Sequence, residues 1–111
     1  DMINYEHTLI KNKRIKMSEI NEGDTISIKL MSGEEVVARL VKDTDRHLMI
    51  ARPMAIVNLS SGIGLGPFMF TTPRFAEMPI NKGNIITYVK TEVAFAKKYA
   101  EGTTGLKFTS K

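Results

Sequence analysis

Residues 25–52 contain three short runs in which apolar side chains recur at every second position. The apolar positions are Ile26, Ile28 and Leu30 in the first run, Val36, Ala38 and Leu40 in the second, and Leu48 and Ile50 in the third. Because successive side chains of a β-strand point to opposite faces, this period of two predicts three half-buried strands. The joints at 32–34 and 42–46 are short and polar, and Gly33 suits a tight turn. Strands joined by such short links form an antiparallel meander.

The length and composition are those of one small globular domain. The chain has 111 residues, of which 42% are hydrophobic and 25% are charged, so it can bury a modest core and differs from disordered sequences. Its net charge of +4 favours polyanionic partners without requiring one. The lack of cysteine excludes disulfides and thiolate metal sites. It also fits a reducing compartment, so we expect a cytoplasmic protein.

Residues 1–23 form a lead-in that is rich in basic side chains. Its densest positive cluster consists of Lys11, Lys13, Arg14 and Lys16. Such a cluster is typical of a solvated surface, and the alternative is an arm that contacts phosphate groups. We divide the chain into this lead-in (1–23), a β-domain (24–90) and a C-terminal helix with a tail (91–111).

Residues 53–73 carry no charge over a length that could cross a bilayer. Three prolines and three glycines would break a lipid-facing helix, so we exclude a membrane span and expect no membrane partner. We predict that the third strand continues to Leu59 and that a fourth strand runs from about Gly66 to Thr72 after a Ser-Ser-Gly loop. The lack of charge on both faces favours burial against a neighbouring subunit. The alternative is a long hydrophobic loop folded over the end of the β-domain.

Residues 91–102 have the pattern of a short amphipathic helix. Thr91 can cap the first turn, and Gly102 can end the helix. The apolar face consists of Val93, Ala96 and Ala100, with Phe95 and Tyr99 beside them. We expect this face to pack on the β-domain or on a neighbouring subunit, and residues 103–111 to be loose.

Two segments resemble the signature motifs of Sm and Sm-like proteins. The alternating runs around Gly33, followed by residues 43–50, are similar to the first motif, and residues 80–86 are similar to the second. The resemblance implies a mainly β fold: a five-stranded, strongly bent antiparallel SH3-like (Sm-type) barrel, here with a C-terminal α-helix. Ala38 stands where the family usually has a glycine that bends the second strand. The helix and the long uncharged region are more similar to divergent bacteriophage members than to spliceosomal or Hfq types.

The resemblance also implies a homo-oligomeric ring that binds RNA at its inner surface. Ring closure would pair the fourth strand of one subunit with the fifth strand of the next, which begins at Ile85 or Ile86, and so satisfy open strand edges. By resemblance, the RNA-binding residues are His47, Met49, Lys82, Gly83 and Asn84. An imidazole can stack on any base, but Met49 replaces the family's base-recognising asparagine and cannot donate and accept hydrogen bonds as an amide does. We therefore expect weak or unselective RNA binding.

Simpler interpretations of these residues remain open. His47 has the setting of an ordinary surface residue, and residues 82–84 suit a plain turn. The sequence has no HExxH motif, nucleophile elbow or P-loop, so we expect neither an enzyme nor a metal or other cofactor. We predict an Sm-like, ring-forming RNA-binding protein. The alternative function is a structural or protein-interaction ring that has lost the RNA site.

Overall fold

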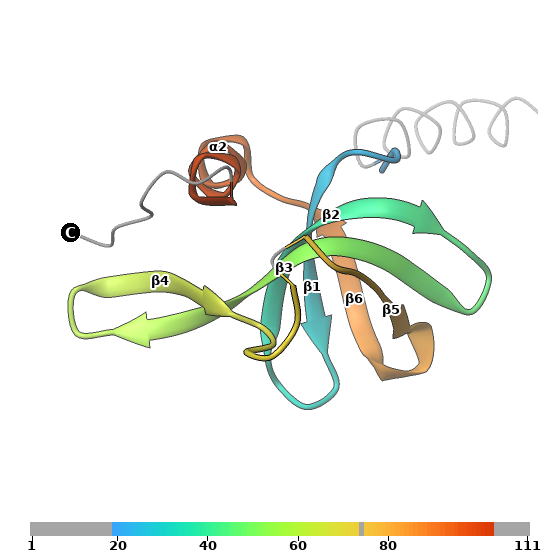
Figure 1. The fold of residues 1–111 in the computed structure, drawn as a ribbon, viewed down its shortest axis with the longest axis horizontal. Helices are drawn as coiled ribbons and strands as arrows, with labels where there is room; N and C mark the ends of the chain where they lie inside the picture. The colour runs from blue at the N-terminus through green and yellow to red at the C-terminus, as the bar shows by residue number, and fades with distance from the viewer. Residues whose placement is uncertain (1–18, 74, 104–111) are drawn as a thin grey trace, which may run out of the picture.

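The structure, a computed structural model, describes residues 19–73 and 75–103, which are mainly β (Figure 1). Within these residues, one six-stranded antiparallel sheet contains β1 (Thr25–Leu30), β2 (Glu35–Asp43), β3 (His47–Leu59), β4 (Gly62–Pro67), β5 (Glu77–Asn81) and β6 (Ile85–Lys90). A 3₁₀ turn, η1 (Lys82–Asn84), joins β5 to β6, and the helix α2 (Val93–Thr103) follows. The basic cluster in the lead-in and the tail residues 104–111 lie outside the described residues.

The predicted meander of β1, β2 and β3 is confirmed. Ile26 lies opposite Ala38, and Leu40 lies opposite Ile50, in antiparallel register. Gly33 adopts a φ of +103° in the first turn, where a residue with a Cβ would be strained. The eight apolar residues of the alternating runs form one core cluster, and none of them is more than 7% exposed. The period of two therefore identified the core.

The long strand β3 bends at its centre. Ala51 pairs with Arg39 and Met54 with Val37, so two residues of β3, Arg52 and Pro53, lie opposite the single residue Ala38. This extra residue is a β-bulge, and Arg52 takes a φ of +54° within it. Since a bulge bends its strand, the bend lies in β3, across from the position where the resemblance implies a glycine in β2.

The predicted fourth strand at 66–72 is wrong in position. Residues 54–59 of β3 pair with β4 along its whole length, from Met54 opposite Pro67 to Leu59 opposite Gly62. The glycines of β4 resemble a loop in sequence, but the pairing with β3 makes this segment a strand. The β3–β4 hairpin extends away from the rest of the sheet (Figure 1). The alternative of a loop folded over the end of the β-domain is therefore wrong for this segment, although Phe68 beyond it does pack against the core.

The expected five-stranded, strongly bent barrel is not confirmed, because the strands in the described part of the chain form a sheet that is not closed. The strand order is β4-β3-β2-β1-β6, with β5 paired to β3. β5 was not predicted because Pro79 interrupts it, yet an edge strand tolerates proline. β6 confirms the predicted last strand and pairs with β1. The sheet is open because β4, β5 and β6 each pair with one strand only, and β5 and β6 do not pair with each other.

The C-terminal helix is confirmed, and its inward side consists of Phe95, Ala96 and Tyr99 from the expected apolar stripe, while Val93 and Ala100 are exposed. Val93 is 83% exposed, whereas Tyr99 is 2% exposed. The Tyr99 hydroxyl donates a hydrogen bond to the carbonyl of Arg52 at 2.7 Å and lies 3.3 Å from that of Ala51, so the helix is fixed at the bend of β3. Glu92, rather than Thr91, caps the helix, because its Oε1 accepts from the backbone N–H of Phe95 at 3.1 Å. No helix in residues 19–73 and 75–103 is long and apolar enough to cross a membrane.

Candidate nucleic-acid interface

The pairing of β3 with β5 brings two turns of the chain together at one corner of the sheet. His47, the first residue of β3, lies opposite Asn81, the last residue of β5. The backbone N–H of Lys82 donates to the carbonyl of Arg46 at 2.8 Å. The turn 44–46 therefore lies directly beside η1, and we call this region, from Asp43 to His47 and from Asn81 to Asn84, the corner.

Each turn of the corner is held by its own polar side chains. The Thr44 hydroxyl donates to the carbonyl of His47 at 2.8 Å and accepts from the His47 N–H at 3.1 Å. The Asn81 side chain caps η1, because its Oδ1 accepts from the N–H of Gly83 at 2.7 Å. A Cβ at position 83 would lie 3.1 Å from this oxygen, so the glycine leaves room for the cap. These hydrogen bonds thus fix the backbone of both turns at the corner.

Lys82 and Asp43 form an ion pair at the corner. The Lys82 Nζ lies 2.6 Å from Asp43 Oδ1, and the Tyr88 hydroxyl donates to Asp43 Oδ2 at 3.1 Å. The Lys82 Nζ also lies 5.8 Å from the centroid of the Tyr88 ring. The hydrogen bond to Asp43 raises the pKa of Lys82 above its ordinary value of 10.5. Lys82 therefore remains a cation at neutral pH, but its ammonium group is already paired with the Asp43 carboxylate.

The structure brings together some of the predicted site residues and separates others. His47, Lys82, Gly83 and Asn84 lie at the corner. Asn84 ends η1, and its carbonyl accepts from the N–H of Met31 at 2.8 Å. Met49 lies farther along β3, half-buried and opposite Pro79, so it is outside the corner.

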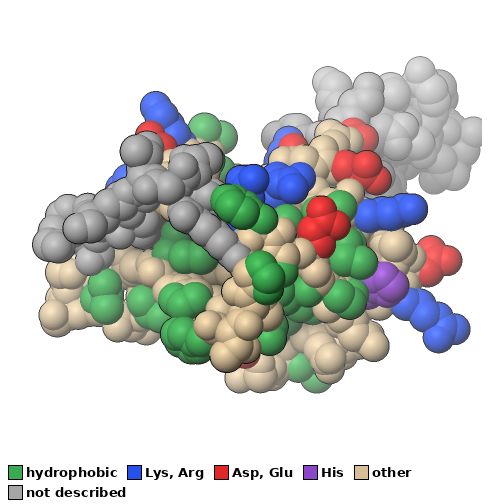
Figure 2. Space-filling model, viewed as in Figure 1, with side chains coloured by type: hydrophobic (Ala, Val, Ile, Leu, Met, Phe, Trp, Pro, Cys, Tyr) green, Lys and Arg blue, Asp and Glu red, His purple; other side chains and the backbone are tan. Residues whose placement is uncertain are grey.

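Sequence reasoning missed three residues of the site. Arg46 is an exposed cation in the turn, and Asp43 and Tyr88 contact Lys82 or its partner. The position of Asp43 at the end of β2 was the only signal available, because its contact with Lys82 joins two distant segments. Figure 2 shows basic and acidic side chains intermixed on this side of the molecule rather than a continuous basic patch.

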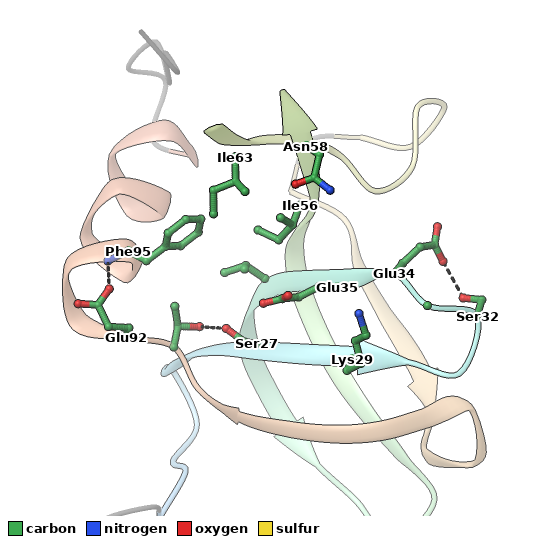
Figure 3. A pocket seen from close by; sticks show the side chains of 13 residues that line it. Ser27, Lys29, Ser32, Glu34, Glu35, Ile56, Asn58, Ile63, Glu92 and Phe95 are labelled. Atoms are coloured by element: carbon green, nitrogen blue, oxygen red, sulfur yellow. Dashed lines mark hydrogen bonds between the residues drawn. The ribbon is translucent and has the colours of Figure 1, made fainter. Parts of the chain in front are cut away.

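A separate groove of about 720 Å³ lies between the β1–β2 part of the sheet, the β3–β4 hairpin and the start of α2 (Figure 3). Its lining mixes charged, amide and apolar groups, among them Lys29, Glu35, Asn58, Ile63, Glu92 and Phe95. Part of this lining serves the fold, since Glu92 caps α2 and the hydroxyls of Ser27 and Thr91 are hydrogen-bonded at 2.8 Å. No cluster that could hold a metal ion is present in residues 19–73 and 75–103.

The corner combines an aromatic ring, two cations and a fixed backbone. An aromatic ring and cations are groups that can bind a base and a phosphate. No family model matches the sequence, and a search of curated proteins finds no match to it.

Proposed function

We propose that this chain is an Sm-like protein whose copies form a ring and bind single-stranded RNA at the corner. The observation that carries the proposal is the contact between the turn 44–46 and η1. These two segments belong to the two motifs that resemble the Sm signatures, and they are far apart in the sequence. Their adjacency supports the assignment because a site built from both motifs requires it.

At the corner, the three functional side chains have distinct roles. The imidazole of His47 provides a stacking surface for a base, which contributes about 1–3 kcal/mol per stacked base. Arg46 and Lys82 attract the phosphate backbone. Met49 adds no hydrogen bonds that read a base, so the binding is weak or unselective in sequence.

Open strand edges of the sheet support the proposed ring, and those of β5 and β6 are the ones that it would pair. Within the described residues, β5 pairs with β3 and β6 with β1, so each strand has one edge without a partner strand. Antiparallel pairing of β5 in one copy with β6 in the next satisfies both edges. It also covers apolar side chains on β6, where Ile86 and Val89 are 60% and 53% exposed in the single chain. β5 takes the role that the sequence assigned to residues 66–72.

A second candidate function is a structural or protein-interaction ring without an RNA site. The ion pair of Lys82 with Asp43 favours it, because this cation is already neutralised. The intermixed charges around the corner favour it as well (Figure 2).

Titration of labelled oligo-U and oligo-A RNA, followed by fluorescence anisotropy at several salt concentrations, tests the proposal. We expect binding that weakens as salt rises, and a loss of about fivefold or more in affinity for His47→Ala, which removes the stacking surface. Asn58→Ala, at an exposed polar position on the hairpin, is the control and should bind RNA as the natural sequence does.

The mass of the assembly in solution is measured in parallel. A ring that binds no RNA at low salt would favour the second candidate function. A monomer at high protein concentration would contradict both.

A further inference from the structure

The Lys82–Asp43 pair differs from an ordinary surface ion pair in how its carboxylate is held. Asp43 Oδ1 contacts the Lys82 ammonium at 2.6 Å, while Oδ2 accepts the hydroxyl of Tyr88 at 3.1 Å. The two side chains are only partly accessible, at 29% for Lys82 and 38% for Asp43. By contrast, Lys90 and Asp24 lie 3.6 Å apart. A hydroxyl and an ammonium thus fix both carboxylate oxygens of Asp43 at the corner.

This geometry has a direct consequence for any anion that approaches Lys82. A phosphate oxygen can reach the ammonium only by displacing Asp43 or by lying next to its negative charge. Tyr88 opposes the displacement, because rotation of the carboxylate breaks the second hydrogen bond as well. Two negative groups a few ångströms apart repel each other, and salt weakens this repulsion at an exposed site.

We propose that Asp43 is an internal competitor of RNA phosphate for Lys82, and that Tyr88 positions Asp43 for this role. This inference rests on the proposed function and assigns a specificity to the same site. With Lys82 occupied, stacking on His47 carries a larger share of the binding than phosphate contacts do. The corner thereby discriminates against duplexes, whose bases are not free to stack, and against polyanions that have no bases.

The first test is Asp43→Asn, which keeps the side-chain shape and removes the charge. We expect RNA affinity at low salt to rise about fivefold, as appropriate for release of a partly exposed ion pair. The plot of log affinity against log salt should also steepen by about 0.7, the value for one additional phosphate contact on a single strand. The affinity for heparin, a polyanion without bases, should rise more than the affinity for RNA does.

The matched control is Asp45→Asn, which makes the same change in charge two residues away. Asp45 is exposed and lies in the same turn. This variant measures the gain due to net charge alone, and we expect that gain to be smaller, with no change in salt slope. Adding Lys82→Ala to Asp43→Asn should abolish the extra gain, because the released cation is then absent.

The pKa of the Lys82 ammonium, measured by NMR, tests the ion pair without RNA. The bond to Asp43 holds this pKa above its ordinary value, so Asp43→Asn should lower it. An unchanged pKa would show that the pair does not form and would overturn the inference, whatever the RNA result.

The other outcomes separate the inference from the proposed function. If the pKa falls and RNA binds, but Asp43→Asn binds no more tightly than Asp45→Asn, the inference is wrong and the proposed function stands. If the pKa falls and neither the natural sequence nor the variants bind RNA, the proposed function fails and the inference fails with it.

Discussion

The two halves of β3 are both rich in apolar residues, but they differ in their neighbouring strands and in burial. Residues 47–51 lie between β2 and β5, and Leu48 and Ile50 are fully buried there. Residues 54–59 pair with β4, and Val57 and Leu59 are 38% and 42% exposed. Both halves are apolar and extended, so apolar content alone does not distinguish them. The comparison teaches that a strand's sequence predicts its extended backbone, whereas its neighbours determine how far it is buried.

The largest expected difference between the halves is in packing energy. Ile50→Ala leaves a cavity in the core, and we expect it to lower the free energy of unfolding by about 2–5 kcal/mol. Ile63→Ala makes the same truncation on the hairpin, where the side chain is 53% exposed, and should cost less than about 1 kcal/mol. Urea denaturation of both variants measures the two values. Equal costs would mean that the hairpin is buried in solution, as burial against a neighbouring copy requires.

The next largest effect concerns Tyr99, which fixes α2 at the junction of the two halves. Tyr99→Phe removes the hydrogen bonds to the backbone at 51 and 52 and should cost about 1–2 kcal/mol. Burial raises the pKa of Tyr99 from 10.0 to about 12, because the anion is poorly solvated there. The unfolded chain therefore loses this proton at lower pH than the folded chain does.

The Tyr99 contribution should be complete below pH 10 and disappear as the pH rises to about 12, a loss of up to about 2–3 kcal/mol. Thermal unfolding of the natural sequence and of Tyr99→Phe between pH 9 and 12 measures it, because the other tyrosines and the lysines titrate in both proteins. Parallel pH profiles for the two proteins would contradict the burial of this hydroxyl.

A smaller effect is expected at Arg52, where the halves meet. Its φ of +54° is unfavourable for any residue with a Cβ. Arg52→Gly should therefore be more stable than Arg52→Ala by about 1 kcal/mol. Both variants lose the contact of the guanidinium with the Phe75 ring, 4.8 Å away, so their difference isolates the backbone term. If the alanine variant is as stable as the glycine variant, residue 52 does not have a positive φ in solution.

The smallest effect is confined to the hairpin. Gly62 has a φ of +131°, whereas a Cβ at Gly66 would meet only an ordinary contact with Val57 at 3.6 Å. Gly62→Ala should weaken the hairpin by about 1 kcal/mol or less, and Gly66→Ala should leave it unchanged. Amide hydrogen exchange of β4 detects this local opening, while global unfolding should stay within about 0.5 kcal/mol. A loss of global unfolding free energy for Gly62→Ala would instead show that the hairpin and the core unfold together.

The core of this fold could be predicted because it depends on local alternation. The eight apolar residues of the alternating runs recur with a period of two, and all of their side chains are buried. The hairpin register and β5 could not be predicted in the same way. Gly62, Gly64, Gly66 and Pro79 are poor strand residues, and their segments form strands by pairing with β3. Whether the sheet closes could not be predicted either, because the alternation within one strand does not specify which strand edges pair.

The candidate site was predictable where a motif was continuous in sequence. Lys82 and Gly83 were found from their own segment, and the structure places them beside His47. Asp43 was not, because its importance arises from contacts to Lys82 and Tyr88 that no spacing encodes. Met49 lies two residues beyond His47 along β3, opposite Pro79.

The turn at Ser60 and Ser61 is the far end of an arm that carries none of the eight core residues (Figure 1). Extra residues inserted there would lengthen only a solvent-facing loop, for which each doubling in length costs about 0.6 kcal/mol. This tip is therefore the natural attachment point for a fluorophore, an affinity tag or a tether to a surface.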